Sequence, residues 1–418
     1  MRRVAIRGGF WKFPGARTTK PTLSFPRLPA RPVICWSSEA CSGRPDLTRK
    51  SYELPKNIGK YADAAKPQAV QRGVIYTVAP SPKDIGLIWV GTDDGMIHVT
   101  RDGGANWQDV TPPTLAAWQK VSLIDAGQHD VNTAFAAVNT LRLDDLRPHI
   151  FRTRDGGKTW TEIVKGIPAG QTVNVVREDP VRPGLLYAGT ERTVYVSFDS
   201  GDNWQPLRFN LPATSVRDLI VKDDDIVVAT HGRGFWILDN VTPLRQIAEK
   251  QQTILFKPQT AVRVRWNLNT DTPLPPDIPA GQNPPDGASI DFYLGEQASG
   301  EVVLEIKNAE GRTVRTFSSN DKQREEDARL RIPTYWPRPD KVLPKTKGFH
   351  RFQWDLHLQP ISYELVDPEY PIAAVPGATA PVATSPWVMP GDYTVTLSVN
   401  GRKFTETLTV KMDPRVAI

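Results

Sequence analysis

Short runs of apolar and β-branched residues, separated by polar turns, recur through the first 240 residues of the chain. In the first unit these runs cover residues 73–78, 87–92, 96–100 and 107–110, and a tight polar turn separates the second run from the third. Runs this short, with turn residues between them, predict antiparallel strands, and long helical periodicity is hard to find. Four strands in each repeat are typical of a blade of a β-propeller.

One motif, S/T-x-D-x-G-x-T/N-W, occurs three times at equivalent places in these units. It covers residues 100–107, 153–160 and 197–204, and its aspartates are 53 and 44 residues apart. This spacing is close to the length of one propeller blade. The flanking runs place the motif in the turn between the third and fourth strands of each blade.

The residue types of the motif suit a tight turn. Its glycines can adopt positive φ, its aspartates can accept hydrogen bonds from the N–H groups of the turn, and its tryptophans can fill the gap between blades. We predict this structural role for Asp102, Gly104, Trp107, Asp155, Gly157, Trp160, Asp199, Gly201 and Trp204. A catalytic or metal-binding role for the aspartates is the alternative, and we expect no metal site.

A fourth unit lacks the motif. Residues 225–230 align with the second run of the other units, residues 231–234 form its turn, and residues 235–239 form a third run. The series then ends at residues 241–243. We therefore expect a partial propeller of about four blades over residues 46–245, which is too few blades to close a ring.

The pattern changes after a region rich in proline. Residues 246–287 are expected to form a connecting strand and a proline-rich linker. Beyond them, strands are predicted at residues 288–294, 301–308, 313–318, 349–356, 392–399 and 403–410. Asn400-Gly401 is a strong hairpin signal between the last two strands. We expect an Ig-like β-sandwich over residues 288–418, so the predicted fold class is all-β.

The charge of the chain is uneven. Its net charge is +6, yet residues 1–50 hold eleven Lys and Arg against two acidic residues, so the remainder is mildly acidic. We expect residues 1–45 to be a disordered basic tail, with a non-native origin as an open alternative, and we expect no nucleic-acid partner. Prolines interrupt this tail, so it lacks the apolar core of a secretory signal, and no apolar run is long enough to span a membrane. No motif for a nucleotide, metal or other cofactor is present.

Residues 70–413 resemble the C-terminal part of large bacterial BNR-repeat proteins, whose Asp box is the repeated motif and whose propeller is sortilin-like. Besides the motif, residues 91–95, 177–180, 229–233, 283–287, 354–356 and 411–415 carry the resemblance. Proteins of this kind are often labelled glycosyl hydrolases because the Asp box occurs in sialidases. The resemblance implies an extracytoplasmic location and earlier blades, so we expect a truncated chain that pairs with missing blades or with itself.

Strand order predicts where a ligand would bind. In an up-and-down blade the Asp boxes share one face with the first turns. The second turns and the connections between blades lie on the opposite face, which we call the second-turn face. Loops that converge over a propeller channel commonly bind ligands. The candidates there for ligand binding are Asp94, Arg142, Asp145, Arg147, Arg192, His231 and Arg233.

Two functions follow from these residues. The first is a non-enzymatic module that binds a protein, peptide or glycan through the second-turn face. The second is a glycoside hydrolase fragment in which Asp93, Asp144 and Glu191 supply paired carboxylates for acid–base chemistry. The structural alternative is that all these charged side chains are solvated, or that they form ion pairs across blades that add little stability.

Overall fold

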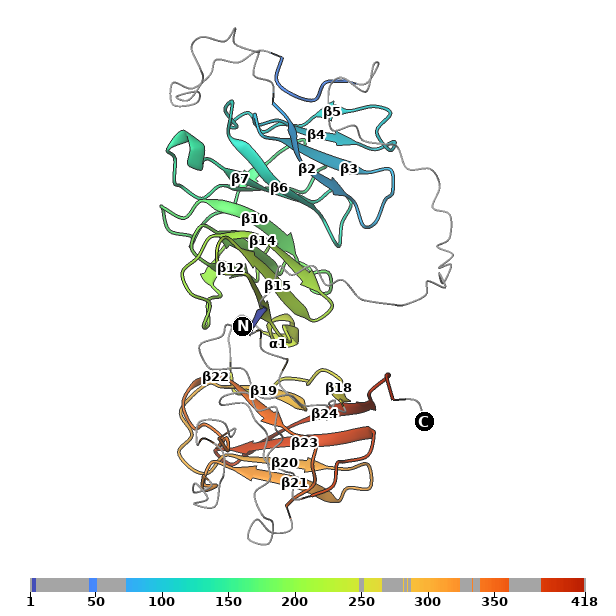
Figure 1. The fold of residues 1–418 in the computed structure, drawn as a ribbon, viewed down its shortest axis with the longest axis vertical. Coiled ribbons are helices and arrows are strands. Elements are labelled where there is room, and N and C mark those ends of the chain that lie inside the picture. The colour runs from blue at the N-terminus through green and yellow to red at the C-terminus, as the bar shows by residue number, and fades with distance from the viewer. Residues whose placement is uncertain are drawn as a thin grey trace. The chain divides into compact units, whose positions relative to one another are not determined.

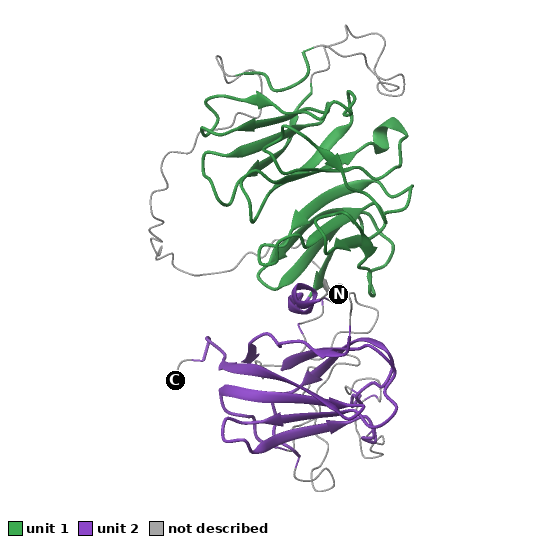
Figure 2. Ribbon diagram, turned by 180° about the vertical axis from the view of Figure 1, so that it is seen from behind, with its two compact units in different colours: residues 1, 3–238 green, residues 2, 239–418 purple. Residues whose placement is uncertain are grey.

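The computed structural model describes residues 2–4, 45–50, 73–247, 252–264, 281, 284, 287–323, 333, 339–360 and 385–416. Its strands form six sheets, and the chain divides into two compact units that meet in sequence at Leu238 and Asp239 (Figures 1 and 2). In the described ranges the helices are short: the 3₁₀ turn η1 (Leu141–Leu143) and α1 (Thr242–Gln246). The predicted all-β class is therefore confirmed.

The first unit contains three sheets that each comprise four consecutive antiparallel strands. Blade 1 is formed by β2 (Ile75–Pro80), β3 (Ile88–Thr92), β4 (Ile97–Thr100) and β5 (Gln108–Asp109). Blade 2 is formed by β6 (Lys120–Ala126), β7 (Ala134–Asn139), β8 (Ile150–Thr153) and β9 (Thr161–Glu162). Blade 3 is formed by β10 (Val173–Glu178), β11 (Leu186–Thr190), β12 (Val194–Ser197) and β13 (Gln205–Pro206).

Blade 4 has three strands from consecutive sequence and one from far away. Strands β14 (Val216–Lys222), β15 (Asp225–Thr230) and β16 (Phe235–Leu238) are antiparallel, and β1 (Arg2–Val4) lies beside β16 as the fourth strand. The Asp box that closes the other blades is missing here. The edge of β16 is therefore free of a local outer strand and accepts one from the N-terminal part of the chain.

The blades are held together by apolar contacts between their faces. Every residue of β3, β7 and β11 is buried, as expected for a strand that is covered on both faces. One apolar cluster joins blades 1 and 2, and another joins blades 2 and 3. In the first cluster the rings of Trp89 and Trp160 meet edge to face, with centroids 5.9 Å apart. Sheet-on-sheet packing thus repeats along the series.

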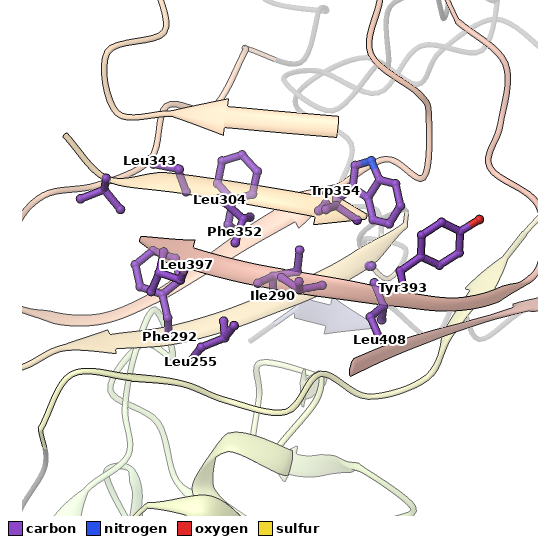
Figure 3. Close-up of a cluster of buried hydrophobic side chains, with 14 of the residues drawn as sticks. Leu255, Ile290, Phe292, Leu304, Leu343, Phe352, Trp354, Tyr393, Leu397 and Leu408 are labelled. Carbon is purple, nitrogen blue, oxygen red and sulfur yellow. The ribbon is translucent and has the colours of Figure 1, made fainter. Parts of the chain in front are cut away.

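The second unit contains two sheets. The smaller has the order β17 (Ile254–Leu255), β19 (Ala288–Leu294), β22 (Gly348–Trp354). The larger has the order β18 (Ala261–Arg263), β24 (Arg402–Met412), β23 (Gly391–Val399), β20 (Val303–Lys307), β21 (Thr313–Ser318), and its β18–β24 pair is parallel. Both sheets contribute to one core, in which Phe292 and Trp354 meet Leu304 and Leu397 (Figure 3). The six strands predicted for this region are all present, and the Ig-like assignment stays a prediction.

A buried ion pair fixes the first residues of this unit. Asp291 is buried, and burial raises the pKa of its carboxyl while the Arg351 guanidinium works against that rise. Arg351 Nε lies 2.7 Å from Asp291 Oδ1, and its Nη atoms donate to the carbonyl oxygens of Asp239 and Asn240. The chain is therefore anchored as soon as it leaves β16.

The predicted domain limits, 46–245, 246–287 and 288–418, stay predictions, although the division into two units falls at residue 238. The predicted tail, residues 1–45, falls mostly outside the described residues. Its described part consists of β1 and Pro45.

Candidate functional site

The three Asp-box turns repeat one set of internal hydrogen bonds. In the first, Asp102 Oδ1 accepts from the Asn106 backbone N at 2.9 Å and from Thr100 Oγ1 at 2.8 Å. The equivalent bonds occur around Asp155 and Asp199. Hydrogen bonds from Asn106 hold the pKa of Asp102 at about 2, and those from Thr159 hold the pKa of Asp155 at about 2. Burial acts to raise the pKa of Asp199, but hydrogen bonds from Asn203 outweigh it and the pKa is lowered.

The Asp-box tryptophans connect each blade to the one before it. Trp160 Nε1 donates to the Val110 carbonyl at 2.7 Å, and Trp204 Nε1 donates to the Ile163 carbonyl at 2.8 Å. Trp107, in blade 1, donates instead to Gly104 of its own turn at 3.2 Å. The geometry gives these residues a role in packing.

Backbone contacts place the turns on two faces. The Asp-box turns contact the first turns, through Gly103 N to the Gly86 carbonyl and Ser200 N to the Gly184 carbonyl. The second turns contact the connections between blades, through Trp118 N to the Asp94 carbonyl and His231 N to the Ser215 carbonyl. The candidate residues therefore gather on the face away from the Asp boxes.

A β-bulge recurs in the innermost strand of each blade, and the sequence did not reveal it. The strand register shifts at Tyr76, Ser122, Asn174 and Arg217. A bulge redirects a side chain that would otherwise continue the alternation of the strand. Three of these residues reach an adjacent blade. Ser122 Oγ donates to the Asn174 carbonyl, Asn174 Nδ2 donates to the Val216 carbonyl, and Arg217 Nη1 lies 3.1 Å from Glu191 Oε1.

Two of the candidate catalytic carboxylates are held by arginines from the next blade. Asp93 Oδ1 accepts from Val74 N at 2.7 Å, while Asp93 Oδ2 lies 3.5 Å from Arg142 Nη1. Arg142 also donates to the Asp93 carbonyl and stacks over the Trp118 ring at 5.1 Å. Glu191 Oε1 accepts from Asn174 Nδ2 at 3.0 Å in addition to Arg217. The structure thus brings acids and arginines together across blades.

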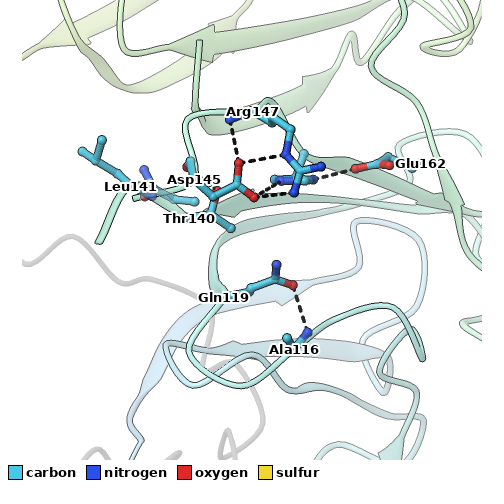
Figure 4. Close-up of polar contacts among 9 residues, drawn as sticks. Ala116, Gln119, Thr140, Leu141, Asp145, Arg147 and Glu162 are labelled. Carbon is cyan, nitrogen blue, oxygen red and sulfur yellow. Dashed lines mark hydrogen bonds and ion pairs between the residues drawn. The ribbon is translucent and has the colours of Figure 1, made fainter. Parts of the chain in front are cut away.

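The long second turn of blade 2 forms its own charged cluster (Figure 4). Arg147 binds both oxygens of Asp145, at 2.9 and 2.8 Å, and the hydrogen bond from Arg147 is the main reason that the pKa of Asp145 lies well below its usual range. His149 bridges Asp145 and Glu162, with Nδ1 2.6 Å from Glu162 Oε1. Asp144 ends η1 in the left-handed conformation, with φ of 60°.

Asp94 differs from the other candidates because it is fully buried. Its carboxylate accepts from Thr92 Oγ1 and, at 2.9 Å, from the backbone N of Arg49. The Arg49 side chain donates to the carbonyl oxygens of Asp94, Gly95 and Leu115, at 2.9, 3.3 and 3.0 Å. We call this set of contacts the arginine cradle. The sequence did not reveal it, because Arg49 and Asp94 lie 45 residues apart and no local pattern connects them.

The remaining candidates lie in exposed turns. Arg192, His231 and Arg233 are exposed, and their backbone groups complete the turns. Across the described ranges no group of three His, Cys, Asp or Glu side chains is arranged to hold a metal ion. The helices described are also too short or too polar to cross a membrane.

Comparison with known proteins finds distant β-propellers. YCF48 from Cyanidioschyzon merolae is 18% identical over 40% of this chain and 54% of that chain, with a TM-score of 0.31. A structure of YCF48 bound to D1 peptide is 12% identical, covers 80% of this chain and 81% of that chain, and has a TM-score of 0.32. The GH74 xyloglucanase from Xanthomonas campestris is 13% identical over 59% of this chain and 37% of that chain, with a TM-score of 0.34.

This chain spans about half the length of the Cyanidioschyzon merolae protein. No family model matches the sequence, and no curated protein matches it. Similarity this distant bears on the fold alone, so the function has to be argued from the residues themselves.

Proposed function

We propose that this chain is a non-enzymatic module that binds an extended protein or peptide segment through its second-turn face, with a glycan as the other ligand class. The observation that carries the proposal is the pairing of Asp93 with Arg142 and of Glu191 with Arg217. A glycoside hydrolase needs one carboxyl that stays protonated to donate to the leaving group. Here arginine N–H groups already lie against Asp93 Oδ2 and Glu191 Oε1, so both of these oxygens are engaged by contacts within the protein.

The same face offers what a binding site needs. Its turns are positioned by rigid blades, and cross-blade bonds hold in place the region that carries three exposed polar side chains: Arg192, His231 and Arg233. Arg49 already inserts its guanidinium between carbonyl oxygens of the second turn of blade 1 and of the connection that follows blade 1. This intramolecular contact supports a peptide as the ligand class.

We also propose that the chain belongs to the BNR-repeat proteins with a sortilin-like propeller and that it works outside the cytoplasm. The three Asp boxes and their shared hydrogen bonds support this proposal.

The test combines binding and turnover on the full chain. Peptide and glycan panels are screened for binding and for release of reducing ends, using the parent and the variants Asp93→Ala, Asp144→Ala and Glu191→Ala. We expect binding without turnover, weakened about fivefold where a variant removes one polar contact worth about 1 kcal/mol. Asp223→Ala, in the exposed first turn of blade 4, is the matched control. Glycan turnover that one of the three variants abolishes would establish the hydrolase instead.

A further inference from the structure

A chain of hydrogen bonds through blades 2, 3 and 4 positions the side chain of Arg217. Asn139 Nδ2 donates to Asn174 Oδ1 at 2.6 Å, and Asn174 Nδ2 donates to Glu191 Oε1 at 3.0 Å. Both asparagines are buried. The same oxygen of Glu191 lies 3.1 Å from Arg217 Nη1. A side chain that is held in this way loses less conformational freedom when it binds a ligand.

One side of the Arg217 guanidinium is open. Glu191 engages the Nη1 atom, whereas Nε and Nη2 have no hydrogen-bond partner among the described residues. The side chain of Arg217 is 46% exposed. Its neighbour Asp218 is already engaged by another arginine, because Asp218 Oδ1 lies 3.4 Å from Arg177 Nη2. Arg217 therefore presents two adjacent N–H donors, which we call the Nε–Nη2 edge, on an exposed side chain.

Other arginines of this chain show what such an edge binds. Three of them place Nε and Nη2 on the two oxygens of one carboxylate, in the pairs Arg147–Asp145, Arg351–Asp291 and Arg415–Asp413. The N–O distances in these pairs lie between 2.6 and 3.1 Å. This bidentate geometry matches the planar guanidinium to the planar carboxylate and is stronger than a single contact. The edge of Arg217 is therefore suited to a carboxylate that the described part of the chain does not supply.

The turns beside Arg217 carry more positive charge. Backbone hydrogen bonds connect residues 214–215, which precede β14, to the second turns of blades 3 and 4. Arg192 and Arg233 lie in these two turns, are exposed, and form no ion pair with other described residues. The two turns contain one acidic residue, Glu191. Three arginines against one glutamate attract an anionic ligand to this part of the second-turn face.

We propose that the Nε–Nη2 edge of Arg217 binds a carboxylate of the peptide ligand, with Arg192 and Arg233 attracting it, so that the second-turn face selects acidic peptides. The inference rests on the proposed function, since it names the chemistry of the ligand that this face binds. The carboxylate belongs either to an aspartate or glutamate side chain of the peptide or to its C-terminus. Both sources present the same two oxygens, and the experiment distinguishes them.

Fluorescence anisotropy of short labelled peptides on the full chain tests the proposal. The peptides carry Asp and Glu, or the amides Asn and Gln, at matched positions, and each is made with a free and with an amidated C-terminus. We expect the parent chain to bind the carboxylate-bearing peptides at least about tenfold more tightly, and Arg217→Gln to remove this preference. Arg192→Gln and Arg233→Gln should each weaken binding about two- to threefold, and salt should reduce that effect. Dependence on the free C-terminus or on Asp and Glu identifies which carboxylate is bound.

Further variants separate the bidentate contact from charge alone. Arg217→Lys keeps the charge but lacks the two parallel donors, so carboxylate-bearing peptides should bind it at least about threefold more weakly than the parent. The double variant Glu191→Gln, Arg217→Gln removes both charges and should also lack the preference, which excludes repulsion by an unpaired Glu191 as the cause. Lys222→Gln, at an exposed residue at the other end of β14, is the matched control and should leave the preference unchanged.

The outcomes distinguish this inference from the function on which it rests. Peptides that bind the parent equally well with and without carboxylates would overturn the inference and leave the binding function intact. Full recovery of binding in Arg217→Lys would overturn the bidentate contact. A chain that binds none of the peptides would overturn both proposals. Near-UV circular dichroism checks that each variant is folded.

Discussion

The Asp-box face and the second-turn face of the propeller are built from the same blades but follow different rules. On the Asp-box face three turns repeat the same bonds, and the bonds lie within each turn. On the second-turn face each turn differs: Asp93 pairs with Arg142, Asp145 with Arg147, and Glu191 with Arg217. The repeated turns mark what three of the blades share for packing, whereas the varied turns are those proposed above to recognise a ligand.

The strongest test of this comparison removes a repeated tryptophan. Trp204→Ala should lower the free energy of unfolding by about 3–5 kcal/mol, because the buried ring fills the junction between blades 2 and 3. Trp107→Ala should cost less than half as much, since among the described residues that indole donates within its own turn, to Gly104. Urea unfolding followed by circular dichroism measures both. Equal losses would show that the two positions pack alike.

Two glycines allow the cost of overpacking to be distinguished from the cost of a strained backbone. Gly201 and Gly232 both have positive φ, 95° and 84°, but a Cβ on Gly201 would lie 2.3 Å from Ile163 Cδ1 while one on Gly232 meets nothing within 4 Å. Gly232→Ala should cost about 1–2 kcal/mol for the left-handed backbone alone. Gly201→Ala should cost about 1–3 kcal/mol more because it overpacks the junction. Thermal unfolding of the two variants tests the difference, which disappears if Ile163 can move aside.

On the second-turn face, burial should make the loss of Asp94 cost more stability than the loss of its neighbour Asp93. Asp94→Ala should cost about 1–3 kcal/mol, since it leaves the buried donors of Thr92 and Arg49 without an acceptor. Asp93→Ala should cost about 0–1 kcal/mol, the range of partly exposed ion pairs. Hydrogen exchange at the Arg49 amide should rise only in the Asp94 variant. An unchanged rate in that variant would mean that the cradle is held by its carbonyl oxygens alone.

The smallest expected effect is that of low pH on the melting temperature, through the aspartates of the Asp-box face. The pKa values of Asp102 and Asp155 fall from an ordinary 3.8 to about 2 in the folded chain. A folded-state pKa below the unfolded value contributes stability that is present above about pH 4 and is lost as pH falls towards 2. Melting temperatures from pH 5 to 2 should therefore fall less steeply in the Asp102→Asn, Asp155→Asn double variant. Identical slopes would contradict this assignment.

The parts of the structure that the sequence predicts are those with local causes. The bonds from Asp102 reach only as far as Asn106, so residues four apart specify the turn wherever the motif occurs. The strands of both units follow from runs of apolar and β-branched residues bounded by turns. Strand order also placed the candidate residues on the face opposite the Asp boxes, because alternate turns of a blade must point in opposite directions.

The parts that escaped prediction have causes far apart in the chain. The bulges at Ser122, Asn174 and Arg217 appear only once neighbouring strands are in register. Arg49 and Asp94, which resemble ordinary surface charges, meet across 45 residues. Contacts of this kind form only when the chain has folded and distant segments lie side by side.

The sequence by itself therefore determined the blades, their turns and the division into faces, because hydrogen bonds within a turn and alternation along a strand depend on neighbouring residues. Only the tertiary structure decided which carboxylates are bound by arginines and which aspartate is buried. Those outcomes depend on the packing of one sheet against the next, and no segment carries that information alone.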